Sequence, residues 1–183
     1  MSATDKKLRI GDIGDPADDS LFGFVAKHWP NHVTRKRPSG WLVCDDGSME
    51  SADFIYFDDS SKPPRLTLIH VKGSGSAGAD RGLSVSDYEI VVGQAVKNLR
   101  YLDRGHIAEK LASNKDNQIG SAVWRNGKRQ KDRSAILKVL AGAGSNMRKS
   151  VVVFQPRARK SEVEAIGELI AKGDLKGKEV RRL

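Results

Sequence analysis

Cysteine is nearly absent from this sequence, since Cys44 is the single thiol among 183 residues. One cysteine can form neither an intramolecular disulfide nor a cysteine metal cluster, which favours a reducing, cytoplasmic setting. Long apolar runs are missing as well. Nothing resembling a signal peptide follows Met1, and no segment approaches the roughly 18 apolar residues that span a bilayer. We therefore expect a soluble protein that is not exported and has no membrane partner.

Acidic residues are the minority charge in this chain. There are 23 Asp and Glu against 32 Lys and Arg, a formal net charge of +9, and this excess favours a polyanionic partner. The 38% of hydrophobic residues are enough for one domain with a sizeable core. We expect a flexible lead-in at residues 1–17, an α/β domain at residues 18–172 and a basic tail at residues 173–183.

Four apolar stretches predict strands, because they are rich in aromatic and β-branched residues and are bounded by turn residues. They are residues 41–44, 53–57, 65–72 and 150–154. Apolar residues at helical spacing predict helices between and around these strands. The helices are expected at residues 21–29, ending at Pro30, at 86–101 and from 161, with weaker periodicity at 107–111 and 134–140. The expected architecture is α/β, a central mixed sheet flanked by helices.

Charged side chains are predicted to meet at one end of this sheet. Successive side chains on a strand point to opposite faces, so His70 and Lys72 project side by side. If Asp53 opens the preceding strand on the same face, a carboxylate, an imidazole and an amine converge there. A carboxylate can hold Mg²⁺ or Mn²⁺, the cation polarises a phosphate and activates water, and an amine orients that water. The arrangement is typical of metal-dependent phosphodiester cleavage.

Within this hypothesis each residue has a role. Asp53 is the metal ligand and Lys72 is the catalytic amine, while the backbone carbonyl of Val71 completes part of the metal shell. Glu50 lies three residues before Asp53 and can add a second carboxylate if the chain bends at the strand entry. Paired acids in loops are usually solvated, and four of them are left out of the site: Asp45, Asp46, Asp58 and Asp59.

Asp53, the run His70-Val71-Lys72 and Gln94 resemble the core of the PD-(D/E)XK nuclease superfamily, whose RecB-like branch has a downstream helical glutamine. The chain is most similar to nuclease-like domains fused to prokaryotic DEAD/DEAH-type helicases of restriction and phage-defence systems. The resemblance implies a restriction-endonuclease-like sheet, a divalent cation, a nucleic-acid substrate, and a Gln94 that orients Lys72 or the scissile phosphate. The similar segments are Cys44-Asp45-Asp46-Gly47, Glu50-Ser51-Ala52-Asp53, Ile69-His70-Val71-Lys72-Gly73-Ser74, Asp87-Tyr88-Glu89, Gly93-Gln94-Ala95-Val96-Lys97 and Val153-Phe154-Gln155-Pro156.

Position 70 departs from the superfamily pattern, which has Asp or Glu two residues before the lysine. His70 adds no negative charge for a hard cation, and an imidazole suits Mn²⁺ or softer metals better than Mg²⁺. Catalytic or ligand use of His70 and simple packing at the strand end are both open. Glu50 is the residue that can restore the missing carboxylate.

Clusters of basic residues are candidate nucleic-acid contacts. One cluster is Arg35-Lys36-Arg37, and Lys97 borders the apolar stripe of the same helix as Gln94. A second cluster follows Trp124, and an aromatic residue among bases is typical of such contacts. It contains Arg125, Lys128, Arg129 and Lys131. The alternative is a solvated loop whose tryptophan packs inward.

Three functions follow from these features. The first is a metal-dependent DNA endonuclease of a restriction or phage-defence system, in which Mg²⁺ or Mn²⁺ is the cofactor and water the nucleophile. The second is a catalytically inactive relative that binds nucleic acid and targets a partner enzyme. The third is a structural or protein-interaction domain whose basic surface serves solubility. RNA as substrate, a helicase or other defence subunit as partner, and a homodimer stay open.

Overall fold

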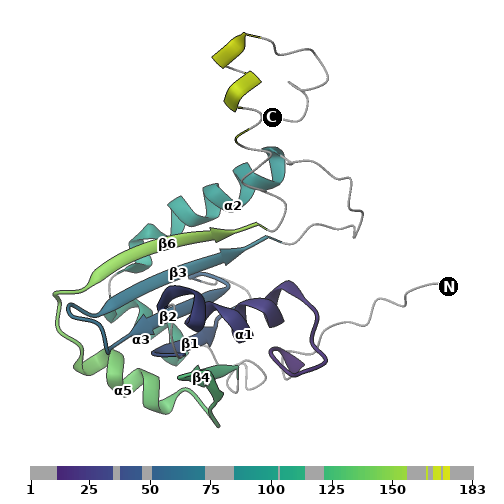
Figure 1. Ribbon diagram of the computed structural model, residues 1–183. Coiled ribbons are helices and arrows are strands. Elements are labelled where there is room, and N and C mark those ends of the chain that lie inside the picture. The colour runs from purple at the N-terminus through teal and green to yellow at the C-terminus, as the bar shows by residue number, and fades with distance from the viewer. Residues whose placement is uncertain are drawn as a thin grey trace.

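The computed structural model describes residues 12–34, 38–46, 51–72, 85–102, 104–113, 122–155, 164, 167–169 and 171–173. Along the chain, one helix is followed by three strands, three helices, two strands, a further helix and a last strand (Figure 1). The helices are α1 (Leu21–Thr34), α2 (Val85–Lys97), the 3-10 helix η2 (Asn98–Leu102), α3 (Arg104–Ser113) and α5 (Ser134–Gly142). The strands are β1 (Trp41–Cys44), β2 (Phe54–Asp58), β3 (Arg65–Val71), β4 (Val123–Arg125), β5 (Lys128–Arg129) and β6 (Arg148–Phe154).

The described strands form one mixed sheet in the order β5-β4-β1-β2-β3-β6. Every neighbouring pair is antiparallel except β3 and β6, which run parallel. The parallel pair is possible because α2, η2, α3 and α5 lie between these two strands in sequence and supply the crossover. The expected α/β class, a mixed sheet flanked by helices, is therefore confirmed.

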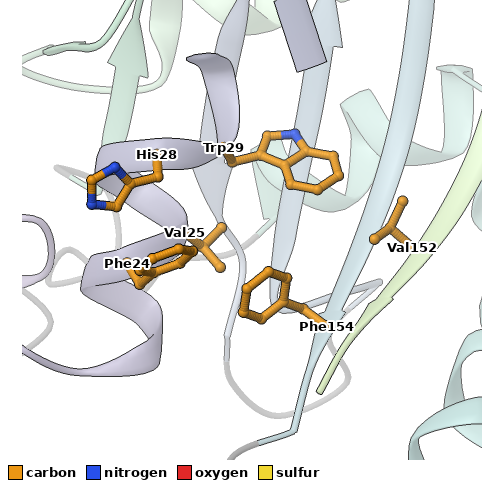
Figure 2. A pocket seen from close by; sticks show the side chains of 6 residues that line it. All are labelled: Phe24, Val25, His28, Trp29, Val152 and Phe154. Carbon is orange, nitrogen blue, oxygen red and sulfur yellow. The ribbon is translucent and has the colours of Figure 1, made fainter. Parts of the chain in front are cut away.

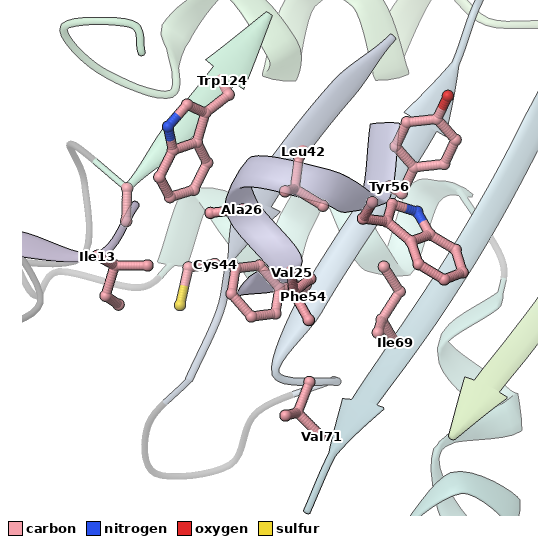
Figure 3. Packing of buried hydrophobic residues seen from close by; sticks show 12 residues of the cluster. Ile13, Val25, Ala26, Leu42, Cys44, Phe54, Tyr56, Ile69, Val71 and Trp124 are labelled. Carbon is pink, nitrogen blue, oxygen red and sulfur yellow. The ribbon is translucent and has the colours of Figure 1, made fainter. Parts of the chain in front are cut away.

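Helices cover both faces of the sheet, and this explains why its central strands β1, β2 and β3 are buried along nearly all of their length. On one face α1 packs its Val25 and Ala26 against Leu42, Phe54 and Ile69, as Figure 3 shows. On the other face, α3 and α5 contribute the buried residues Ile107, Leu111, Ile136 and Leu140. Side chains of β1, β2 and β3 alternate between these two clusters, so the period of two in the sequence sets the register of the core.

Most of the predicted elements are confirmed to within two residues. The strands predicted at 41–44, 53–57, 65–72 and 150–154 correspond to β1, β2, β3 and β6. The weak helical periodicity at 134–140 corresponds to α5, and that at 107–111 lies within α3. The last predicted helix, from 161, lies largely outside the described residues, although those described there at 164, 167–169 and 171–172 are helical.

One prediction about local structure is wrong, and one alternative left open by the sequence is replaced. The first helix does not end at Pro30, since α1 continues to Thr34. A proline removes only one backbone donor, and Trp29 in the preceding position is buried in the core, so packing outweighs the loss. The basic segment after Trp124, for which a solvated loop was one alternative, contains the hairpin of β4 and β5, whose turn residues Asn126 and Gly127 have φ values of 50° and 75°. An Asn-Gly pair with positive φ is the usual two-residue hairpin turn, so the signal was present in the sequence.

Candidate active site

Asp53 lies at the entry to β2, beside the carboxyl end of β3. The β2–β3 ladder pairs Phe54 with Ile69, which makes Asp53 and His70 the next two positions along it. The Asp53 carboxylate leans onto β3, where its Oδ2 accepts a hydrogen bond from the Val71 backbone N–H at 2.7 Å. The side chain thereby replaces the carbonyl that a continued strand would offer to Val71. This hydrogen bond holds a carboxylate at the position immediately before Lys72.

The pKa of the Asp53 carboxyl responds to two other charged groups, Asp46 and Lys72. Burial raises the pKa of the Asp53 carboxyl from its ordinary value of 3.8 to about 6. The Val71 N–H works in the opposite direction, the negative charge of Asp46 raises this pKa further, and the positive charge of Lys72 lowers it. Lys72 and Asp46 therefore both lie close enough to act on Asp53. The carboxylate and the amine that the sequence assigned to one place are neighbours at this end of the sheet.

His70 lies under the surface at the same end of β3. Its side chain is 1% exposed, and its Nε2 has no hydrogen-bond partner among the described residues. Burial lowers the pKa of the imidazole, so the ring is neutral near pH 7, the form that binds metal ions. The structure places His70 next to Asp53 along the ladder, and its use as a ligand or catalytic group stays a prediction.

The residues present fit a divalent cation in three respects. Asp53 offers hard carboxylate oxygens, and His70 offers a buried nitrogen that no described residue satisfies. The N–H and C=O of a strand residue point to the same neighbouring strand, so the Val71 carbonyl faces the Asp53 side as its N–H does. Among the residues that the structure describes, no three His, Cys, Asp or Glu side chains form a group that could hold a metal ion. Glu50, the predicted second carboxylate, lies outside those residues.

Asp46 is an acid that the sequence interpretation left out of the site. It follows β1, and the Asp45 backbone N–H donates to the Asp53 carbonyl at 2.9 Å, so the end of β1 lies against the entry of β2. Antiparallel neighbours bring the end of one strand beside the start of the next, and this rule applied to residues 44–53 would have found Asp46. A second carboxylate at the site is therefore available within the described residues.

Asp45 is buried, and the expectation that it is solvated is wrong. Its side chain is 1% exposed and pairs with Arg133, the Oδ1 and Nη1 atoms being 3.5 Å apart. Its Oδ2 accepts a hydrogen bond from the Ser51 N–H at 3.2 Å, and Arg133 also donates to the Cys44 carbonyl. Asp45 therefore ties the end of β1 to α5 and to the chain that leads into Asp53.

Asp58 and Asp59 are not free loop acids either. Asp58 is buried and accepts hydrogen bonds from the backbone N–H and the hydroxyl of Ser60. Asp59 pairs with Arg125 at 2.7 Å. Both lie at the opposite end of β2 from Asp53, as their exclusion from the site required.

Gln94 and Lys97 are exposed on α2. Among the side chains of α2 that the structure describes, Val91 and Ala95 are buried, and Asn98 at the start of η2 is buried as well. The helix α2 packs along β3 and β6 (Figure 1). The exposed positions leave both polar side chains outside this buried set. The orienting role of Gln94 and the nucleic-acid contact of Lys97 stay predictions.

The arginines of the basic hairpin are engaged within the protein. The Arg125 guanidinium lies 4.9 Å from the centre of the Trp41 ring, and that of Arg129 lies 5.0 Å from the Trp124 ring. Trp124 is buried in the cluster between α1 and the sheet, so the alternative that its ring packs inward is confirmed. The ring is therefore not exposed for stacking on a nucleic-acid base. Lys128 and Lys131 are exposed on the hairpin and its exit. The other basic cluster, Arg35-Lys36-Arg37, lies outside the described residues.

Cys44 takes no part in this chemistry. It is buried in the cluster between α1 and the sheet, and burial raises the pKa of its thiol to about 12, so the thiol stays protonated and is a poor nucleophile.

In the described part of the chain, no helix has the length and apolar character needed to cross a bilayer. Comparison of the chain with protein-family models, with curated proteins and with solved structures finds no match in any of the three.

Proposed function

We propose that this protein is a metal-dependent nuclease that hydrolyses phosphodiester bonds in DNA, with a site and a restriction-endonuclease-like fold of the PD-(D/E)XK kind. One observation carries the proposal: the Asp53 carboxylate is fixed to the Val71 N–H at 2.7 Å, and the next residue, Lys72, acts on it electrostatically. The meander of β1, β2 and β3, with the acid opening β2 and the lysine following β3, supports the same assignment. The restriction or phage-defence setting and a helicase partner come from the sequence resemblance.

The chain's own groups divide the chemistry between them. Asp53, together with Glu50, Asp46 or His70, would hold Mg²⁺ or Mn²⁺. A divalent cation in this position lowers the pKa of a bound water and polarises the phosphate. Lys72 orients the attacking water and offsets the negative charge that develops on the phosphate oxygens. Water is the nucleophile in this proposal, and the buried, protonated Cys44 does not compete with it.

Lys72→Ala is expected to lower the rate of DNA cleavage by about 10²-fold, which is the usual contribution of one preorganised charge to a transition state. Cleavage of supercoiled, linear and single-stranded DNA and of RNA, each with Mg²⁺ or Mn²⁺, measures it. Lys149→Ala is the matched control, because Lys149 is an exposed lysine at the opposite end of the β3–β6 pair. Unchanged cleavage by Lys72→Ala would remove Lys72 from the site.

Cation binding is expected to weaken as the pH falls through about 6, because Asp53 has a pKa of about 6 and only its ionised form binds the cation. The dissociation constant for Mn²⁺, measured by calorimetry at several pH values, should rise about tenfold per pH unit below that point. In Asp53→Asn this pH-dependent step should disappear. An affinity that is the same on both sides of the expected midpoint would contradict the role of Asp53.

A catalytically inactive protein that binds nucleic acid is the second candidate, and the buried, neutral His70 in place of the usual acid favours it. It differs from the nuclease in one result. The wild-type protein would bind DNA with a steep salt dependence and cleave none of the substrates with either cation.

A further inference from the structure

A hollow lined by aromatic rings lies between α1 and β6, and we name it the ring hollow (Figure 2). Its volume is about 340 Å³, which is within the range of small-molecule sites. Residues of α1 form one wall and residues of β6 the other, and four of the six carry a ring. They are Phe24, Val25, His28, Trp29, Val152 and Phe154.

Phe24 lies at stacking distance from two other rings of this hollow, and the rings of Phe24 and His28 are exposed to solvent. The Phe24 ring centre lies 4.6 Å from that of His28 and 5.7 Å from that of Phe154. Phe24 is 49% exposed although phenylalanine is usually buried, and His28 beside it is exposed as well. A flat, π-bonded ligand can therefore reach ring faces that the protein's own core leaves uncovered.

The ring hollow and the candidate active site lie at the same end of the sheet but on opposite faces of it. Phe154 pairs with Val71, the residue whose N–H binds Asp53. The Phe154 carbonyl also accepts a hydrogen bond from the Lys72 backbone N–H at 3.0 Å. By strand alternation Lys72 projects to the face opposite the Phe154 ring, so a base next to a phosphate at Lys72 reaches the ring hollow where the DNA strand passes around this end of the sheet.

We infer that the ring hollow binds an unpaired base of single-stranded DNA next to the phosphodiester that is cut. The choice of DNA as the ligand rests on the proposed function. A base offers the flat π-face that Phe24, His28 and Phe154 can stack on, and the net charge of +9 suits the attached phosphates. A base in a duplex is already paired and stacked, and it can enter such a hollow only after extrusion. The substrate class is therefore single-stranded DNA, or an unpaired end or bubble.

Binding in EDTA tests the inference without cleavage. Fluorescence anisotropy compares a labelled single-stranded oligonucleotide, the same strand with abasic sites, and the duplex of equal length. Wild type should bind the single strand about tenfold more tightly than the abasic strand or the duplex. Phe24→Ala should lose this preference by weakening single-strand binding about tenfold, with abasic binding unchanged, and Phe24→Trp should retain it.

The matched control is Leu99→Ala. Leu99 lies in η2, directly after α2, and its apolar side chain is 48% exposed, close to the exposure of Phe24. The Leu99→Ala variant should bind every probe as wild type does, and Phe24→Leu, which keeps an apolar side chain but no ring, verifies that the effect needs an aromatic face. Equal binding of single-stranded and abasic DNA, or a Phe24→Ala variant that behaves as wild type, would overturn the inference. So would loss of self-association in Phe24→Ala without loss of DNA binding, which would assign the hollow to a second copy of the chain.

The two proposals fail in different experiments. A protein that binds bases through Phe24 in EDTA but cleaves nothing with Mg²⁺ or Mn²⁺ keeps the ring hollow and loses the nuclease. A protein that cleaves DNA through Lys72, while Phe24→Ala binds and cuts as wild type does, keeps the nuclease and loses the ring hollow.

Discussion

Asp53→Asn is expected to abolish cleavage and, at the same time, to raise the free energy of unfolding at neutral pH. Asparagine has nearly the shape of aspartate, and its side-chain oxygen can still accept the hydrogen bond that Val71 N–H donates at 2.7 Å. The substitution therefore removes the charge and keeps the contact. Loss of the carboxylate should lower the cleavage rate by at least about 10³-fold, because the cation and the charge stabilisation it supplies are lost together.

The gain in stability follows from the pKa of Asp53, which burial raises from 3.8 to about 6. In this pH interval the folded protein binds more protons than the unfolded chain, so the free energy of unfolding falls as the pH rises. The cost is absent below the lower value and complete above the higher one. Removing the charge should therefore stabilise the protein by about 1–3 kcal/mol at neutral pH and have little effect near pH 4.

Urea unfolding of wild type and Asp53→Asn at several pH values measures this difference, and cleavage assays on the same samples measure the loss of activity. Asp53→Ala is the matched control, since it removes the charge and also leaves the Val71 N–H without its acceptor. It should be less stable than Asp53→Asn. If Asp53→Asn proved less stable than wild type at neutral pH, the carboxylate would be a structural cap and not a strained functional group.

The neighbouring positions of Asp53 and Lys72 were predictable because both depend on adjacent strands. Alternation along the strands and the order of apolar runs were enough to place an acid beside a lysine. The sequence left two roles open for His70, use in the site and packing at the strand end. Its position on the strand was predictable, but the packing of α2 along β3 was not. Sequence patterns resolve which face a residue occupies, and they do not resolve what packs above it.

Contacts between distant segments were not predictable in the same way. Asp45 and Arg133 lie far apart in the sequence, and nothing near either residue marks it as buried. The rule that paired loop acids are solvated failed for Asp45 because a partner came from another element. The contacts of the basic hairpin were also not predictable from the sequence. Arg125 and Arg129 look free in sequence, and the fold engages them with Asp59, Trp41 and Trp124.

Arg133→Ala is expected to be the most destabilising single change among those considered for this chain. Arg133 is 7% exposed, lies 3.5 Å from the Asp45 carboxylate and donates to the Cys44 carbonyl. Truncating one member of a buried ion pair leaves the other charge buried and costs about 3–5 kcal/mol. Because Asp45 also accepts from Ser51 N–H on the chain leading to Asp53, cleavage should fall together with stability.

A double-mutant cycle separates the ion pair from the rest of the packing. The combined Asp45→Asn and Arg133→Met variant should be more stable than Arg133→Ala, since it leaves no uncompensated charge in the interior. Arg125→Ala is the control, because the Arg125–Asp59 pair is 31% and 27% exposed and its ion pair should contribute only about 1 kcal/mol or less. Urea unfolding of wild type, the single variants Asp45→Asn and Arg133→Met, their combination, Arg133→Ala and Arg125→Ala measures all of these differences. Equal destabilisation by Arg133→Ala and Arg125→Ala would mean that the Asp45–Arg133 pair is hydrated, and that the end of β1 is held by backbone pairing with β2 and β4 alone.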